Sequence, residues 1–161
     1  GTNKLYDFID DNLGVELHGG HVTNDPWNIG RNYKMVSLNT TLQVDLTGQA
    51  NSETLGTRQY SGGGGALNTC MGAQMSPGGK SILALRATAK GGTVSTIVPC
   101  FKDGQSVTIP RADIDYVVTE YGIAHLKSMN VRKRVDSLIA IAHPDFREWL
   151  RSEAKALQYI F

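Results

Sequence analysis

The sequence predicts an α/β protein with a mainly parallel open sheet, flanked by helices, and a short antiparallel hairpin. Short apolar runs of strand character alternate along the chain with segments whose apolar residues recur at helical spacing, the order typical of parallel sheets. Four consecutive glycines, residues 62–65, separate two such segments. Glu120, Tyr121 and Gly122 follow the apolar run 115–119, at the carboxyl end of a predicted strand, where open α/β sheets bind ligands.

The first segment has a helical pattern. Apolar residues at Leu5, Phe8 and Ile9 predict a short amphipathic helix over residues 3–11. Residues 15–18 alternate in polarity and predict a short strand.

The region before the glycines contains two predicted strands. A turn at residues 24–26 and a short helix or irregular connection over 27–33 come first. Residues 35–39 and 41–45 then alternate between apolar and polar, as strands with one buried face do.

The region after the glycines begins with a predicted helix over residues 66–75. The run 81–85 is almost continuously apolar, which is typical of a strand buried on both faces. A strand over 94–98 is stopped by Pro99. Asp103-Gly104 predicts a hairpin turn that pairs residues 95–98 with 106–109 in antiparallel fashion.

The last quarter is predicted to be helical. Asn130 is placed to cap one helix and Pro144 to open a second. Phe146 and Trp149 on the second helix are predicted to lie in the core, and the cluster 132–134 is predicted to be a solvated basic face.

Composition excludes several classes of protein. The chain of 161 residues is 40% hydrophobic and carries a formal charge of +1, so it has one domain's length and no basic field for nucleic acid. Its apolar runs are too short to cross a membrane and its start lacks a signal pattern, which predicts a cytoplasmic protein. Cys70 and Cys100 lack the spacing of a disulfide framework or zinc site. His18 and His21 lack a patterned third ligand, so no metal is predicted.

The chain opens at Gly1 and runs directly into the first helical pattern. We therefore expect residues 1–161 to be a domain cut from a longer, two-domain protein.

The glycine loop, defined as residues 62–65, is a candidate binding site. Glycine leaves its backbone N–H group accessible and adopts positive φ freely, so the loop suits a ligand whose oxygens need backbone donors. A flexible linker is the alternative, although the ordered patterns on both sides favour a binding loop. Glu53, shortly before the loop, is either a catalytic carboxylate or a surface residue. Gln74 and Asn68 occupy positions where a P-loop and a dinucleotide fingerprint require glycine, so neither motif is present.

Several motifs together resemble one family. They are residues 61–68, Gly78-Gly79-Lys80-Ser81-Ile82, Thr88-Ala89-Lys90-Gly91-Gly92, Ile97-Val98-Pro99, the run 113–124 that contains Asp-Tyr-Val-Val-Thr-Glu-Tyr-Gly-Ile-Ala, and residues 141–147. The chain resembles the carboxyl-terminal domain of the acetyl-CoA hydrolase/transferase family, in particular 4-hydroxybutyrate and butyrate:acetate coenzyme A-transferases. It departs from the family's usual Gln-x-Asp-Phe after the glycines, because Ala66, Asn68 and Thr69 stand there, and Arg86 replaces a usual proline.

This resemblance implies a mechanism and a set of site residues. In the family a glutamate attacks an acyl-CoA thioester and becomes a glutamyl-CoA thioester, which passes CoA to a second carboxylate. That glutamate lies upstream of the segment resembling residues 4–8, so the fragment alone is expected to be inactive. The loop glycines Gly63, Gly64 and Gly65 are expected to bind the thioester oxyanion, and the residues expected to contact substrate or CoA are Gly62, Ala66, Asn68, Lys80, Lys90 and Glu120.

The resemblance also implies partners. Acyl-CoA and a carboxylate are substrates rather than resident cofactors, the domain works with its own N-terminal domain, and the protein is a homo-oligomer that binds neither nucleic acid nor membrane. Two alternatives remain: an acyl-CoA hydrolase, in which water replaces the acceptor carboxylate, and a non-catalytic module that binds CoA or a nucleotide.

Overall fold

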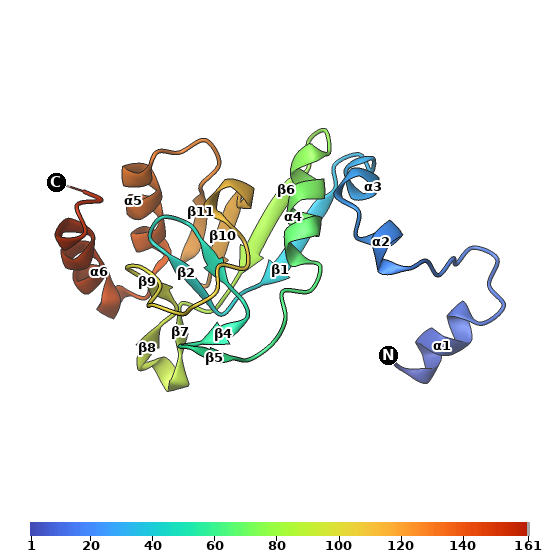
Figure 1. The fold of residues 1–161 in the computed structure, drawn as a ribbon, viewed down its shortest axis with the longest axis horizontal. Helices are drawn as coiled ribbons and strands as arrows, with labels where there is room; N and C mark the ends of the chain where they lie inside the picture. The colour runs from blue at the N-terminus through green and yellow to red at the C-terminus, as the bar shows by residue number, and fades with distance from the viewer. Residues whose placement is uncertain (161) are drawn as a thin grey trace.

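A computed structural model describes residues 1–160 and confirms the α/β class. The main sheet has four strands in the order β1-β6-β10-β11. The first three run parallel and the last is antiparallel to β10; their bounds are β1 Val36–Thr40, β6 Lys80–Ala84, β10 Tyr116–Thr119 and β11 Gly122–His125. Helices α4 (Ala66–Met75) and α5 (Val131–Ile141) pack against this sheet (Figure 1).

A second, smaller sheet has the order β3-β2-β9. Its central strand is β2 (Gln43–Asp45). This strand pairs in parallel with β9 (Ile97–Val98) and in antiparallel with β3 (Ala50–Asn51). Two small antiparallel pairs lie beside it: β4 Thr54–Leu55 with β5 Arg58–Gln59, and β7 Thr88–Ala89 with β8 Val94–Ser95. Short 3-10 turns cover η1 Lys90–Gly92 and η2 Arg111–Asp113.

The N-terminal segment forms an arm that stands away from the rest of the chain (Figure 1). It contains α1 Asn3–Ile9 and α2 Gly20–Thr23, and each residue of α1 remains at least partly exposed. The predicted strand over 15–18 is wrong, because this stretch has no neighbouring strand with which to pair and is irregular. Helix α3 Pro26–Gly30 follows, begins with the Asp25 cap, and packs on α4.

Local capping chemistry fixes the C-terminal helices as predicted. The Asn130 side chain accepts a hydrogen bond from the Lys133 amide and begins α5, and Pro144 opens α6 (Pro144–Ala156). The prediction that Trp149 lies in the core is wrong, since this side chain is 43% exposed. The basic cluster is solvated only in part, because Arg134 is buried and donates to the carbonyl oxygens of Met129 and Arg111.

The predicted hairpin at Asp103-Gly104 is also wrong. Gly104 has a φ of 82° and the turn forms, yet its flanks do not pair with each other. Strand β9 joins β2 in parallel instead, and Ile109 bridges Ala50. Pro99 directly follows β9 and ends it four residues before Asp103, and backbone groups distant in sequence form the hydrogen bonds that a local hairpin would have used.

The hydrophobic core lies between the main sheet and helices α4 and α5. Strand residues Leu83 and Val117 and helix residues Val135 and Leu138 are fully buried there. Ser37 and Thr119 point to the same side, since Ser37 bonds Thr69 of α4 and Thr119 donates to the carbonyl of Ile141. Both helices therefore cover one face of the sheet.

Candidate functional site

The glycine loop lies at the carboxyl edge of the main sheet. Helix α4 runs antiparallel to β1, because Asn39 near the end of β1 donates to Thr69 in the first turn of α4 at 3.0 Å. At the other end, Ser76 after α4 accepts from the Met35 amide just before β1. The loop and the N-terminus of α4 consequently lie where the parallel strands end.

The loop's backbone conformation depends on glycine at one position, Gly64. Gly64 has a φ of 54°, a left-handed conformation that costs side-chain-bearing residues energy. Gly65 has a φ of −94°, and a Cβ atom there would come within 2.6 Å of Nδ2 at the end of the exposed Asn24 side chain, so that side chain would have to shift. Gly62 has neither constraint, since a Cβ there would meet nothing within 4 Å.

The loop leads directly into the first turn of α4, which has no capping side chain. Gly65 is the N-cap, and within residues 1–160 no side-chain hydrogen bond caps this helix. The amides that open a helix lack partners within it and carry partial positive charge. Ala66 and Asn68 belong to this turn and are half-buried, so the loop and the helix start together form a row of backbone donors suited to an anion.

Glu53 supports the loop from beneath. Its carbonyl oxygen accepts from the amides of Tyr60 and Ser61, at 2.7 and 3.1 Å. Its carboxylate Oε2 accepts from Thr108 Oγ1 at 2.8 Å, and a Cβ atom added to Gly63 would lie 3.7 Å from the other carboxylate oxygen, Oε1. The side chain that the sequence offers as either a catalytic carboxylate or a surface residue is thus half-buried and hydrogen-bonded near the loop.

Glu120 lies at the same carboxyl edge, directly after β10. Its Oε2 accepts from the Ala87 amide at 2.9 Å. This hydrogen bond, helped by the nearby charges of Arg86 and His143, lowers the pKa of Glu120 below its usual value. The Glu120 side chain is exposed and ionised. Strand β6 lies between β10 and β1, so β10, which Glu120 follows, is two strand spacings, about 10 Å, from β1.

The two candidate lysines lie at opposite ends of β6. Lys80 is the first residue of this strand, at the amino edge of the sheet. Lys90 follows the strand's carboxyl end and begins η1, at the tip of the β7–β8 pair. There Lys90 lines a pocket of about 430 Å³ together with Leu55 and Gly56. These two residues belong to the β4–β5 pair, which directly precedes the glycine loop in the chain. The structure brings Lys90, but not Lys80, to the edge that holds the loop.

Sequence reasoning missed three polar residues around the loop: Asn24, Asn39 and Thr108. Asn39 is half-buried and donates to Ser37, Thr69 and, at 3.7 Å, the sulfur of Cys70. Burial raises the pKa of the Cys70 thiol, so this cysteine is a neutral member of the cluster. The signal in the sequence was weak, because Asn39 ends an alternating strand pattern as a surface residue would.

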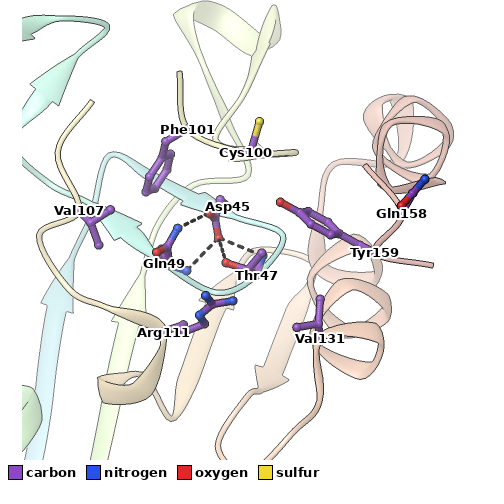
Figure 2. Close-up of a pocket in the computed structure, with 10 residues that line it drawn as sticks. All are labelled: Asp45, Thr47, Gln49, Cys100, Phe101, Val107, Arg111, Val131, Gln158 and Tyr159. Carbon is purple, nitrogen blue, oxygen red and sulfur yellow. Dashed lines mark hydrogen bonds between the residues drawn. The ribbon is translucent and has the colours of Figure 1, made fainter. Parts of the chain in front are cut away.

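A separate pocket of about 560 Å³ lies away from this edge, between the β2–β3 turn, the 100–111 segment and the C-terminus (Figure 2). Asp45 within it is buried, but both carboxylate oxygens are bonded inside their own turn, to Thr47 and Gln49. Asp45 therefore stabilises the turn, and the residues that line this pocket do not include the candidate site residues.

The remaining predicted chemistry is dispersed. Residues 1–160 contain no cluster of His, Cys, Asp or Glu able to hold a metal, and His18 forms a hydrogen bond with Glu16 at 2.8 Å. His143 caps α6, as a turn residue does, and its ring meets Tyr121 edge-on at 5.2 Å. None of the helices in the described part of the chain combines the length and apolarity needed to cross a bilayer.

The fold and this edge define an open α/β domain whose glycine loop and helix start present backbone donors at the carboxyl ends of parallel strands. The chain belongs to the acetyl-CoA hydrolase/transferase family: the model of that family's C-terminal domain matches residues 1–154. It is 50% identical over 155 residues to a 4-hydroxybutyrate coenzyme A transferase of Clostridium kluyveri, covering 96% of this chain and 36% of that protein. It is 47% identical over 160 residues to a succinyl-CoA:cyclohexane-1-carboxylate CoA transferase of Geobacter metallireducens, covering 99% and 37%.

Solved structures agree with this assignment. RipA from Yersinia pestis matches with a TM-score of 0.92 and 42% identity, covering 99% of this chain and 36% of RipA. A 4-hydroxybutyrate CoA-transferase from Porphyromonas gingivalis matches with a TM-score of 0.80 and 41% identity, covering 98% and 35%. The resemblance seen in the sequence is confirmed, and the chain spans little more than a third of the curated relatives it matches.

Proposed function

We propose that residues 1–161 form the C-terminal half of a CoA-transferase that moves CoA between an acyl-CoA and a short-chain carboxylate. The observation that carries this proposal is the glycine loop leading into the uncapped start of α4 at the carboxyl edge of the sheet. Family membership supports it, because the relatives described above are named as coenzyme A transferases.

In the proposed reaction a glutamate outside this chain attacks the thioester carbonyl. The amides of Gly63, Gly64 and Gly65 donate hydrogen bonds to the oxyanion that forms, and the α4 dipole adds to this stabilisation. The carbonyl then reforms as CoA thiolate leaves, giving an acyl-glutamyl anhydride. The thiolate attacks the glutamyl carbonyl, and the departing carboxylate leaves glutamyl-CoA, which passes CoA to the acceptor carboxylate by the same steps in reverse.

Two side chains have roles in this proposal beyond the loop. Lys90 binds a CoA phosphate, supported by its place on the loop's side of the sheet. Glu120, kept ionised by the Ala87 amide, helps to orient groups at the same edge. The position of Lys80 at the opposite edge favours Lys90 of the two candidates. We further propose that the whole protein contains an N-terminal domain and assembles as a homo-oligomer.

The test is transfer of labelled acetate into acetyl-CoA by the full-length protein supplied with butyryl-CoA. Incorporation of acetate at the rate of butyryl-CoA loss supports a transferase. Thioester loss without incorporation identifies a hydrolase, and CoA binding without turnover identifies a non-catalytic module; either outcome refutes the proposal.

A further inference from the structure

The pocket of about 560 Å³ beside the C-terminus has a positively charged wall (Figure 2). Arg111 of η2 lines the pocket and is exposed. Arg134 of α5 lies directly behind it, since its Nη1 donates to the Arg111 carbonyl oxygen at 3.0 Å. Arg134 is buried, and its other hydrogen bonds go to the carbonyl oxygens of Met129 and Thr47. Within residues 1–160 neither guanidinium group forms an ion pair with a carboxylate.

The proximity of these two arginines is unfavourable without an anion. Burial, and after it the positive charge of Arg111, lowers the pKa of Arg134 below its usual value. An anion bound to Arg111 would offset this repulsion, because it attracts both positive charges. A guanidinium group presents its donors in a planar fork, which fits a carboxylate in a bidentate arrangement. Arg111 is therefore suited to bind the carboxylate of a ligand.

Asp45 is the only carboxylate among the residues that line the pocket, and its hydrogen bonds lie within its own turn. Oδ1 accepts from the amide and hydroxyl of Thr47 and from the Gln49 amide, and Oδ2 accepts from the Gln49 side chain. The residue is only 1% exposed, so its oxygens are not available to a cation. The charges of Arg111 and Arg134 exceed that of Asp45 by one, which favours a monoanion.

The remaining wall of the pocket indicates the kind of anion. Figure 2 shows the Tyr159 hydroxyl pointing inward from the C-terminal segment. Burial, followed by the negative charge of Asp45, raises the pKa of Tyr159, so its hydroxyl stays protonated and can donate a hydrogen bond. The volume is in the range of small-molecule sites, which are mostly apolar with a few polar groups that fix orientation. The apolar wall of this pocket consists of Phe101, Val107 and Val131.

We propose that this pocket binds a short-chain aliphatic carboxylate, with its carboxylate group on Arg111 and Tyr159 and its alkyl chain against the apolar wall. The residues of the glycine loop do not line this pocket, so the two sites are separate within the described part of the chain. Short-chain carboxylates are also the class that the proposed reaction consumes and releases, so occupancy of the pocket would follow their concentration. Binding here does not depend on that reaction.

Methyl NMR of the full-length protein with labelled valines measures binding in this pocket directly. Val107 and Val131 line the pocket, whereas Val36, which is 54% exposed, begins β1 and does not. Butyrate titrated through the millimolar range at constant ionic strength should shift the Val107 and Val131 signals along one saturable curve and leave Val36 unshifted. Butyramide has nearly the same size but no charge, and should bind at least about tenfold more weakly.

Matched variants identify the groups that hold the carboxylate. Arg111→Gln should raise the Kd for butyrate about tenfold or more, because it removes charge-assisted hydrogen bonds. Arg132→Gln removes an exposed arginine of α5 that does not line the pocket, and should leave this Kd unchanged. Tyr159→Phe should raise the Kd about fivefold through loss of one donor. This milder change provides the measurement if Arg111→Gln lowers Tm.

The proposal is overturned if butyrate leaves the Val107 and Val131 signals unshifted, which would show that the rest of the protein fills the pocket. Equal affinity for butyramide would also overturn it, as would tighter binding of inorganic phosphate than of butyrate. An unchanged Kd in both Arg111→Gln and Tyr159→Phe would place butyrate elsewhere. Acyl transfer by the same preparation is measured separately. Transfer without butyrate binding here refutes this site alone, and binding here without transfer refutes the proposed reaction alone.

Discussion

Replacing Gly64 with valine in the full-length protein tests whether the glycine loop stabilises the oxyanion. Gly64 has a φ of 54°, and a Cβ atom there would meet nothing within 4 Å. The substitution therefore introduces backbone strain without a steric clash. A side chain in the left-handed conformation costs roughly 1–2 kcal/mol, which the loop can relieve by rotating its amides away from the thioester.

The expected effect is larger on catalysis than on stability. Loss of one oxyanion donor costs about 3 kcal/mol, so kcat should fall on the order of a hundredfold or more while KM for acyl-CoA changes little. Strain alone should lower Tm by only about 2–4 °C for each kcal/mol. Steady-state kinetics and thermal melting on one preparation measure both quantities.

Two matched variants make this result interpretable. Gly62→Ala adds a methyl group where φ is ordinary and space is open, so kcat and Tm should both be unchanged. Gly64→Asn should retain most of the activity, because asparagine tolerates the left-handed conformation. The reasoning is refuted if Gly64→Val keeps normal kcat at an unchanged Tm. A large fall in Tm with parallel loss of CoA binding would instead show that the loop is a structural turn.

Three further predictions follow from the same structure. Lys90→Ala should weaken CoA binding to the full-length protein about tenfold by calorimetry, whereas Lys80→Ala, at the other edge, should leave it unchanged. Unchanged CoA binding in Lys90→Ala would exclude the proposed phosphate contact. The lowered pKa of Glu120 means that its ionised form stabilises the fold at pH values above the ordinary glutamate pKa of 4.5, and that this contribution is lost as the pH falls through the lowered pKa. Glu120→Gln should therefore show a flatter decline of Tm than the unmodified protein in this acid range. An identical decline of Tm in both proteins would contradict the assignment. Thr108→Val removes the hydroxyl that bonds Glu53, and should lower the free energy of unfolding by roughly 1–3 kcal/mol in urea titration; no change would show that this bond contributes nothing.

The sequence by itself determined the elements whose stability is local. Asn130 and Pro144 begin their helices through contacts within one turn, so their predicted positions were correct. The apolar runs of β6 and β10 were likewise identified, and the family motifs were sufficient to assign the chain correctly. The glycine loop was identified from its run of four consecutive glycines alone, without knowledge of the residues that surround it in the fold.

Tertiary structure decided which elements meet, because pairing and burial depend on residues far apart in sequence. The Asp103-Gly104 turn is present, but Ile109 forms an antiparallel bridge with Ala50 and does not pair within a local hairpin. Glu120 obtained its lowered pKa from the Ala87 amide, 33 positions away, which sequence spacing does not reveal.

The two lysines illustrate the same limit. In the sequence Lys80 and Lys90 are equivalent, since each lies beside a glycine turn. Strand β6 between them makes them different, because a strand rises about 3.3 Å per residue and carries its two ends to opposite edges of the sheet. Local chemistry thus specified each segment, and the direction in which each strand crosses the sheet determined which segments share a site.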